Sequence, residues 1–406
     1  MMKKIYFSLA INLFLAGMAS GESIQDFGVK PSNSAEVNKV KLQKAIDQMS
    51  PIGGVLYVDP SDTPYHIAGG IILKKNVSLV GANAATPRGT KHPSKPQPVG
   101  SVIKITDTEN VFITVESATQ IKGIQFWYSD QARVDPSKII EYPATIRLST
   151  ETKTMGVTLN NLTFYGEYLA IDFAAQNGIV SELLTVEHCF GYPLSGIFIR
   201  IDYCYDIPRI LHCHVNPAIQ REFAGDNSRA IIDAVIAKKT FAYSIEHTDN
   251  AQLIDVFSFG TYGGIKLGGE SYGQLTNFNF DCVTIGIHKT GNNTFNRNWQ
   301  IAQGSIIANA GEAIEDIHPI VIEGKGHTAL SNVEAFSGNN PALTNHGVSY
   351  DFMTVKGDER CTISMFGCRM RNYTAKEPIT VLNKNAVIQT FGCIDKEEEI
   401  FEYQKK

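Results

Sequence analysis

The sequence predicts an all-β solenoid of stacked parallel strands, closed at its N-terminal end by one helix. The main observation is a repeat of short strand-like segments: Ile287 follows Ile265 by 22 residues, and Ile265 follows Tyr243 by 22. Repeats of this length, built from strands, are typical of a solenoid, because one coil cannot bury its apolar face alone. The copies read GIFIRID (196–202), GIKLGGES (264–271) and GIHKTG (286–291), with weaker copies AIDFAA (170–175) and AYSIEHTD (242–249).

Side chains alternate within each copy, which assigns them to two faces. If the copies stack as parallel strands about 5 Å apart, the outward residues form a charged ladder, and we look for chemistry there. The residues expected to point inward are Ile171, Ile197, Ile199, Tyr243, Ile245, Ile265, Leu267 and Ile287. The residues expected to point outward are Asp172, Arg200, Asp202, Glu246, Lys266, Glu270 and His288.

The N-terminal residues and the composition indicate the compartment. Residues 1–20 combine a basic start, an apolar run and small residues, which is typical of a cleavable signal peptide and predicts a secreted or periplasmic protein. No later stretch has 18 uninterrupted apolar residues, so we expect no membrane insertion. A net charge of −5 argues against a nucleic-acid partner. Disulfides are permitted in this compartment, but we expect the seven cysteines to be buried thiols inside the solenoid.

Residues 21–65 predict an N-terminal cap, consisting of a helix at about 35–49 and the first strands. Ser34 is placed to cap the helix, and Pro51 with the following glycines ends it. An amphipathic helix here would cover the open apolar end of the solenoid. Its apolar face comprises Val37, Leu42, Ala45, Ile46 and Met49.

The segments FGVKPSNSAEVNKVKLQKAIDQMSPIGGVLYVDP (27–60) and YHIAGGIILKKNVSLVGAN (65–83) resemble the N-terminal signature of the pectate-lyase-like superfamily. That superfamily includes rhamnogalacturonases, polygalacturonases, some epimerases and phage tailspikes. The resemblance covers about residues 23–84. It implies a single-stranded right-handed parallel β-helix and a carbohydrate substrate, and it leaves a homo-oligomer such as a trimer open. The polygalacturonase motifs NTD, DD and GHG are absent, so no catalytic residue is carried over.

The β-helix is expected over 66–395, followed by a charged tail at 396–406. Its spacing breaks once, because Tyr243 lies 46 residues after Ile197, about one coil plus an insertion. We place this insertion at about 217–241 and expect a helix within it. Insertions in solenoids often project over the binding face, so we expect this one to overhang the ladder.

The ladder predicts a glycoside hydrolase acting on a polysaccharide or oligosaccharide, with no cofactor. Hydrolysis needs two carboxyl groups about 5–5.5 Å apart for retention or 6.5–9.5 Å for inversion, and neighbouring coils offer such spacings. Asp202, Glu246 and Glu270 are the predicted catalytic acids. The predicted substrate contacts are Asp172, Arg200, Lys266, His288, Trp127, Tyr128 and Arg221, the two aromatic residues by stacking on sugar rings.

Two other functions remain open from the residues. A polysaccharide lyase acting on a uronate would use cations and a base, for which Arg200, Lys266, His288 and Arg209 are available. A non-catalytic glycan-binding or adhesin β-helix would use the same surface without turnover. The histidines 212, 214 and 247 have only weak metal-site spacing, and we predict no metal.

Overall fold

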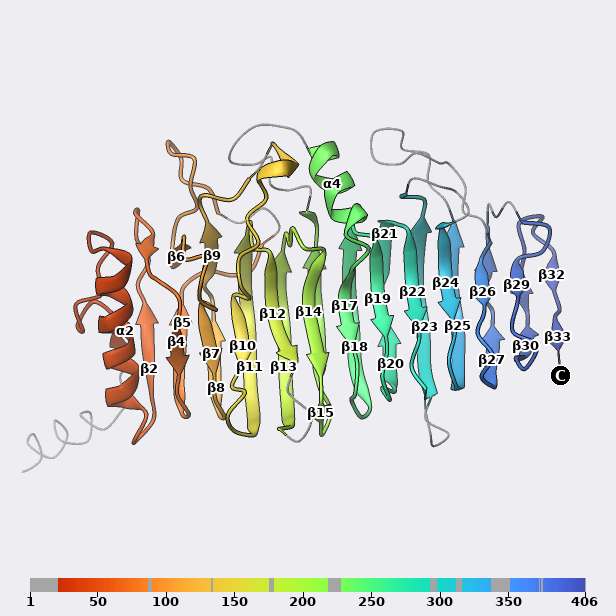
Figure 1. The fold of residues 1–406 in the computed structure, drawn as a ribbon, viewed down its shortest axis with the longest axis horizontal. Coiled ribbons are helices and arrows are strands. Elements are labelled where there is room, and N and C mark those ends of the chain that lie inside the picture. The colour runs from red at the N-terminus through yellow and green to blue at the C-terminus, as the bar shows by residue number, and fades with distance from the viewer. Residues whose placement is uncertain are drawn as a thin grey trace, which may run out of the picture.

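The computed structural model describes residues 21–86, 90–132, 134–174, 179–217, 228–292, 298–311, 316–336, 351–371, 373 and 375–405. The predicted signal peptide lies outside the described residues. The chain winds into a stack of parallel coils that runs from the helix α2 (Ala35–Met49) at one end to the C-terminus at the other (Figure 1). The predicted fold class, an all-β parallel β-helix with a capping helix, is confirmed.

One wall of the β-helix is an 11-stranded parallel sheet, and it contains the repeated motifs. Register is continuous along it, so residues at equivalent positions of successive coils stand side by side. Its strands are β4 (Ile71–Leu73), β7 (Ile113–Val115), β10 (Ile146–Leu148), β12 (Leu169–Ala174), β14 (Ile197–Asp202), β17 (Phe241–Ile245), β19 (Gly263–Leu267), β22 (Ile285–Lys289), β24 (His318–Ile322), β26 (Met353–Val355) and β29 (Ile379–Val381).

The other walls form one 22-stranded sheet whose longer strands bend around a corner. The short helical segments η2 (Pro136–Lys138) and α4 (Ser228–Ala237) lie in the connections. The strands are β1 (Glu22–Ser23), β2 (Gly54–Val58), β3 (Tyr65–His66), β5 (Val77–Gly81), β6 (Val102–Ile105), β8 (Thr119–Lys122), β9 (Gln125–Tyr128), β11 (Thr154–Tyr165), β13 (Ser181–Gly191), β15 (Cys204–Tyr205), β16 (Arg209–Val215), β18 (Ala251–Phe259), β20 (Gly273–Thr276), β21 (Asn279–Val283), β23 (Asn298–Ala308), β25 (Gly326–Phe336), β27 (Cys361–Phe366), β28 (Arg369–Met370), β30 (Val387–Phe391), β31 (Cys393–Ile394), β32 (Ile400–Phe401) and β33 (Gln404–Lys405).

The bend of these long strands occurs at a column of residues with left-handed backbone, which we call the left-handed corner. Asparagine and glycine tolerate a positive φ better than most residues, and they occupy most of the column. Strand register places one such residue of each coil beside the next. The column comprises Gly123, Asn161, His188, His212, Asp255, Asn277, Gln303, Asn332, Gly367 and Gly392.

The core inside the coils contains nearly all of the residues that alternation assigned to it. Ile171, Ile199, Tyr243, Ile245, Ile265, Leu267 and Ile287 are fully buried. The inward assignment of Ile197 is wrong, because Ile197 is only half-buried and lines a surface pocket. Its neighbour Phe198 is buried instead and packs on Phe164, 5.8 Å between ring centroids, so the consecutive residues Phe198 and Ile199 are both buried. All seven cysteines are buried free thiols, as predicted.

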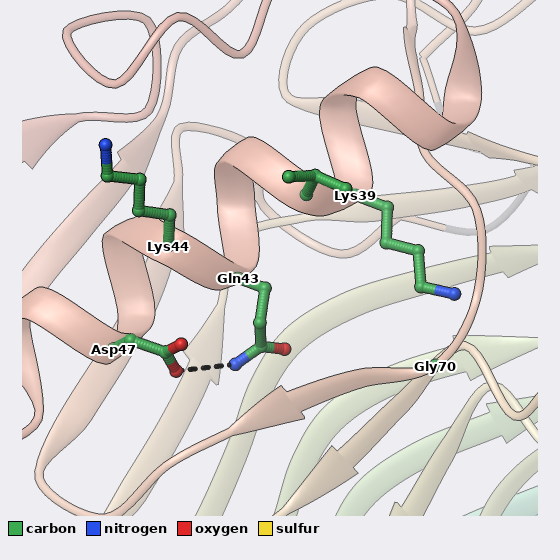
Figure 2. Close-up of a pocket in the computed structure, with 6 residues that line it drawn as sticks. Lys39, Gln43, Lys44, Asp47 and Gly70 are labelled. Atoms are coloured by element: carbon green, nitrogen blue, oxygen red, sulfur yellow. Dashed lines mark hydrogen bonds between the residues drawn. The ribbon is translucent and has the colours of Figure 1, made fainter.

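Both ends of the stack are covered. At the N-terminal end, the Gln43 side chain of α2 accepts a hydrogen bond from the Ile72 N–H at 2.8 Å and donates one to the Ile72 carbonyl at 3.1 Å. It thereby satisfies the free edge of β4, the first strand of the 11-stranded sheet. Figure 2 shows Gln43 between α2 and this strand, held also by its hydrogen bond to Asp47. At the other end, β32 and β33 pair antiparallel with β31 and β30.

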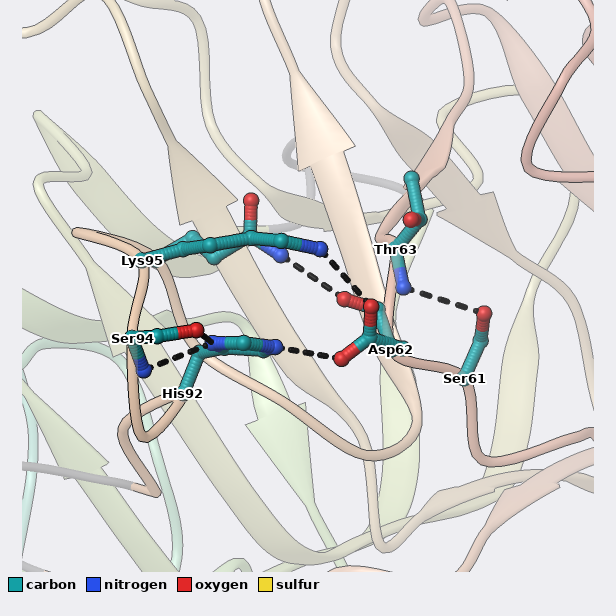
Figure 3. A network of polar contacts seen from close by, with 7 residues as sticks. Ser61, Asp62, Thr63, His92, Ser94 and Lys95 are labelled. Atoms are coloured by element: carbon teal, nitrogen blue, oxygen red, sulfur yellow. Dashed lines mark hydrogen bonds and ion pairs between the residues drawn. The ribbon is translucent and has the colours of Figure 1, made fainter.

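A polar loop after β5, which contains His92, Lys95 and Gln97, is held by hydrogen bonds to the turn that follows β2. Asp62 accepts hydrogen bonds from His92 and from the Lys95 ammonium, the latter at 2.7 Å (Figure 3). Gln97 adds a bond to the Asp62 carbonyl at 2.8 Å. These contacts lower the pKa of Asp62, chiefly through Lys95. No helix within the described residues is long and apolar enough to span a membrane.

A half-buried histidine on the outer face of the 22-stranded sheet predicts a pH-dependent stability. His214 stacks on Phe257 at 4.4 Å and meets Phe190 edge to face, and desolvation lowers its pKa to about 4. The unfolded chain, with a histidine pKa near 6.5, binds the proton more readily, so stability is full above about pH 6.5 and falls by up to about 3 kcal/mol as the pH drops toward 4. Urea unfolding of His214→Phe should show a smaller loss between pH 7 and 4.5 than the wild-type protein. Equal losses would contradict this assignment.

Candidate active site

A pocket of about 550 Å³ lies on the outer face of the 11-stranded sheet, over β14, β17, β19 and β22. One side is apolar and the floor is polar and charged. Lys239 and Thr240, which follow α4 in the chain, form part of its wall. Its lining comprises Ile197, Arg200, Lys239, Thr240, Phe241, Ser244, Glu246, Tyr262, Lys266, Ile285, His288 and Lys356.

The charged floor consists of two columns of outward residues set by strand register. The first column aligns Asp172, Arg200, Ser244, Lys266 and His288 on successive coils. The second column lies two residues further along each coil. Backbone hydrogen bonds between successive coils keep its residues side by side. This column comprises Asp202, Glu246, Gly268, Thr290 and Glu323.

Glu246 lies in the pocket and leans over the next coil. Its Oε1 is 3.0 Å from the Lys266 ammonium and accepts a bond from the Ser244 hydroxyl at 3.3 Å. A Cβ on Gly268 would lie 2.1 Å from Glu246 Oε2, so any larger residue would displace this carboxylate from its present position. Gly268 therefore shapes the site because it has no side chain, and not because of its backbone φ.

His288 and Glu323 form a second charged group beside Lys266. His288 Nε2 lies 2.6 Å from Glu323 Oε1, and the Lys356 ammonium is 3.8 Å from the other carboxylate oxygen. Burial lowers the pKa of His288, while the charge and hydrogen bond of Glu323 oppose this effect. His288 is therefore mainly neutral near pH 7.

Glu323 is absent from the residues predicted from sequence. The segment HPIVIEG repeats the strand pattern, but Ile320 follows Ile287 by 33 residues instead of 22. The extra residues lie in the connections before and after β23, which itself pairs in register with β20 and β21 of the preceding coil. A search without fixed spacing for an apolar strand followed by an acid would have found this coil, since His318–Ile322 is followed by Glu323.

Arg200 is held by Asp172 in a bidentate ion pair. Its Nε and Nη2 donate to the two carboxylate oxygens of Asp172 at 2.8 and 2.7 Å. The Arg200 side chain is 43% exposed and lines the pocket, whereas Asp172 is 13% exposed. Asp172 thus orients the guanidinium and leaves its remaining N–H groups to face a ligand.

Two of the three predicted catalytic acids lie outside the pocket lining. Asp202 accepts hydrogen bonds from the backbone N–H of Tyr203 and of His247, and it lies 2.9 Å from His247 Nδ1. Glu270 is exposed and follows Gly269, where a φ of 54° turns the chain away from β19. On that coil the ladder position is occupied by Gly268, so the expected alignment of Glu270 with Asp202 and Glu246 is wrong: the strand ends at Leu267 and the alternation ends with it.

The predicted aromatic contacts are also corrected. Trp127 and Tyr128 lie on β9 in the other sheet and are 9% and 2% exposed, so they offer no face to a sugar. Trp127 packs with Val102, Tyr165 and Tyr192, because its strand runs beneath their side chains. Arg221 lies outside the described residues. The three histidines of the weak metal pattern are separated by their stacking partners: His212 on His188, His214 on Phe257 and His247 on Tyr203.

Comparison with known proteins gives matches at the level of structure. No protein-family model and no curated protein sequence matches the chain. Among solved structures, the A-module of a mannuronan C-5 epimerase from Azotobacter vinelandii is 13% identical, with a TM-score of 0.53, covering 92% of this chain and 99% of that one. An exopolygalacturonase from Thermotoga maritima is 11% identical, with a TM-score of 0.53 and coverages of 98% and 99%.

A third similar structure is a DFA-IIIase from Arthrobacter chlorophenolicus A6, 9% identical with a TM-score of 0.57, covering 94% of this chain and 95% of that one. Identities this low establish the fold and transfer no residue role. Together with the continuous parallel register, these matches show that the protein has a right-handed parallel β-helix fold.

Proposed function

We propose that the protein is a secreted or periplasmic glycoside hydrolase that cleaves an acidic polysaccharide or oligosaccharide in the pocket over β14–β22. The observation that carries this proposal is that Glu246 extends to the coil of Gly268 and Glu323 extends to His288, so the two carboxylates reach toward each other over the intervening coils. The solved structures of the same fold include proteins named for polygalacturonan and mannuronan, which supports a glycan as the substrate class.

The separation of the two carboxylates suits hydrolysis. Their backbones are three coils apart, but Glu246 extends forward over Gly268 and Glu323 reaches back to His288. Their carboxylates therefore lie about one coil apart along the stack, and with the lateral offset their separation is on the order of 5–9 Å. That range spans the distances used by retaining and inverting enzymes.

The partners of each carboxylate suggest its role. Glu246, paired with the Lys266 ammonium, acts as the base or nucleophile. His288, in contact with Glu323, takes up a proton as the pH falls below neutral, and this proton is delivered to the departing glycosidic oxygen. Hydrolysis should therefore be fastest in mildly acidic solution.

The excess of cations in the pocket points to an anionic substrate. Arg200, Lys239, Lys266 and Lys356 line it, whereas Glu246 is the one carboxylate among its lining residues within the described part of the chain. A uronate carboxylate would pair with Arg200, whose planar N–H groups match it. The wall residues Lys239 and Thr240 lie at the C-terminal end of the predicted insertion, which supports the expectation that this segment borders the binding groove.

The same cations and the neutral His288 favour a polysaccharide lyase as the second candidate. In that reaction Arg200 and Lys266 would hold the uronate carboxylate while His288 removes the neighbouring proton. A lyase using a neutral imidazole gains activity as the pH rises through neutrality, which is opposite to the hydrolase.

The test is a panel of glycans assayed with the full-length protein between about pH 4.5 and 8.5, a range that spans the histidine pKa. Each uronate-containing glycan is matched by its carboxyl-reduced form. We expect new reducing ends without unsaturated uronate absorbance, an acidic optimum, and weak activity on the reduced form. Unsaturated products would identify the lyase, and saturable binding without turnover would identify a binding module.

A further inference from the structure

We propose that the left-handed corner carries a second, separate site, which binds a divalent transition-metal ion through Glu187, His188 and His212. One potential ligand atom from each of these residues lies within 4.8 Å of the others. The three residues lie on β13 and β16 of the 22-stranded sheet, whereas the pocket lies on the outer face of the 11-stranded sheet. The site is therefore independent of the proposed hydrolase function.

The backbone brings the two histidines together. Glu187 pairs with Leu211 and Phe190 with His214, so His188 and His212 occupy the same position on consecutive coils. Both have left-handed backbone, with φ of 50° and 54°, and their rings stack with centroids 4.7 Å apart. Other coils place Asn161, Asn277 and Asn332 at this position, so the corner itself does not require an imidazole.

Neighbouring side chains orient the ligands. His212 Nδ1 lies 2.8 Å from Asp255 Oδ2, an arrangement in which Nδ1–H donates and the Nε2 lone pair remains for a metal. Asn160 donates to Glu187 Oε2 at 3.0 Å, and Glu187 Oε1 faces His188 Nδ1 at 3.5 Å. In metal sites, a carboxylate commonly accepts a hydrogen bond from the other ring nitrogen of a ligating histidine and fixes the orientation of the ring.

The donor set identifies the class of ion. Two imidazoles and one carboxylate suit Zn²⁺, Ni²⁺ or Cu²⁺, whereas Ca²⁺ and Mg²⁺ prefer sites made of oxygen ligands. Around a tetrahedral zinc, ligand atoms lie roughly 3.4 Å apart. The ligand atoms of the three side chains must therefore move about 1 Å closer to one another when the ion binds. Their exposures of 34% for Glu187, 47% for His188 and 42% for His212 permit this rotation and leave a position for water.

Isothermal titration calorimetry of the chelator-treated full-length protein with ZnCl₂ tests the proposal. Near pH 7.5 we expect one saturable site with a micromolar Kd, and binding should be lost at about pH 5.5 because the imidazoles must be unprotonated. His188→Asn and His212→Asn should each weaken binding at least about 10-fold, since each removes a ligand. Asparagine already occupies this corner on other coils, so both variants should fold.

Two further variants make the result specific. Glu187→Gln should also weaken binding, while His214→Phe, two residues from His212 on the same strand, should leave the Kd unchanged. Circular dichroism confirms that each variant is folded. Absence of saturable binding at millimolar zinc, or unchanged affinity in both histidine-to-asparagine variants, would overturn the proposal.

Discussion

Replacing Glu246 by glutamine is expected to lower kcat by about 10²–10⁴-fold while the protein stays folded, because the variant keeps the shape of the side chain but removes the group that accepts a proton. Glu323→Gln should have an effect of similar size, since it removes the carboxyl partner of His288. Initial rates on the glycan found in the panel, measured with thermal unfolding of each variant, check this expectation.

Glu270→Gln is the matched control. Glu270 lies in the turn after β19 and outside the pocket lining, so its variant should keep near-normal turnover. Asp202→Asn should be only mildly impaired, because its amide oxygen can still accept the bonds from the backbone N–H groups at 203 and 247. If Glu246→Gln and Glu323→Gln retain activity while the Glu270 variant is inactive, the assignment of the acids made here is wrong.

Leu267→Asp and Ile287→Asp are each expected to abolish soluble expression. Both side chains are fully buried in the stack, and burying an unpaired carboxylate costs several kcal/mol, comparable with the stability of a whole domain. Soluble yield and the circular dichroism spectrum measure the outcome.

Ile254→Asp provides the comparison, because Ile254 is an aliphatic residue on a strand of the same stack but is 37% exposed. Its variant should express normally. Normal yield of both the Leu267 and the Ile287 variants would show that these coils tolerate a charge in their interior, contrary to their burial.

The sequence predicted the fold well because strand alternation and coil length are local properties. Tyr243, Ile265 and Ile287 follow one another at 22-residue intervals, and all three are buried at the same register position. The prediction failed for Ile197, which lines the pocket while its neighbour Phe198 packs on Phe164 of the preceding coil. The alternation within a single strand does not encode such packing between coils.

The site was predicted less completely, because it depends on contacts between coils of unequal length. Glu246, Lys266, His288 and Arg200 were expected to share one outer face, and the pocket contains all four. Glu323 was missed because its coil is 33 residues from the preceding one. The burial of Trp127 was not predictable from its own segment, since Tyr165 and Tyr192 of later coils cover it.

The covered ends of the stack have a consequence for how the protein behaves at high concentration. A row of stacked parallel strands has the same spacing as an amyloid fibril, and each open end is a template on which another chain can add strands. Here Gln43 occupies the hydrogen-bonding groups of Ile72 at one end, and β32 and β33 reverse direction at the other. These two devices oppose the addition of further strands to β4 at one end and to β30 and β31 at the other.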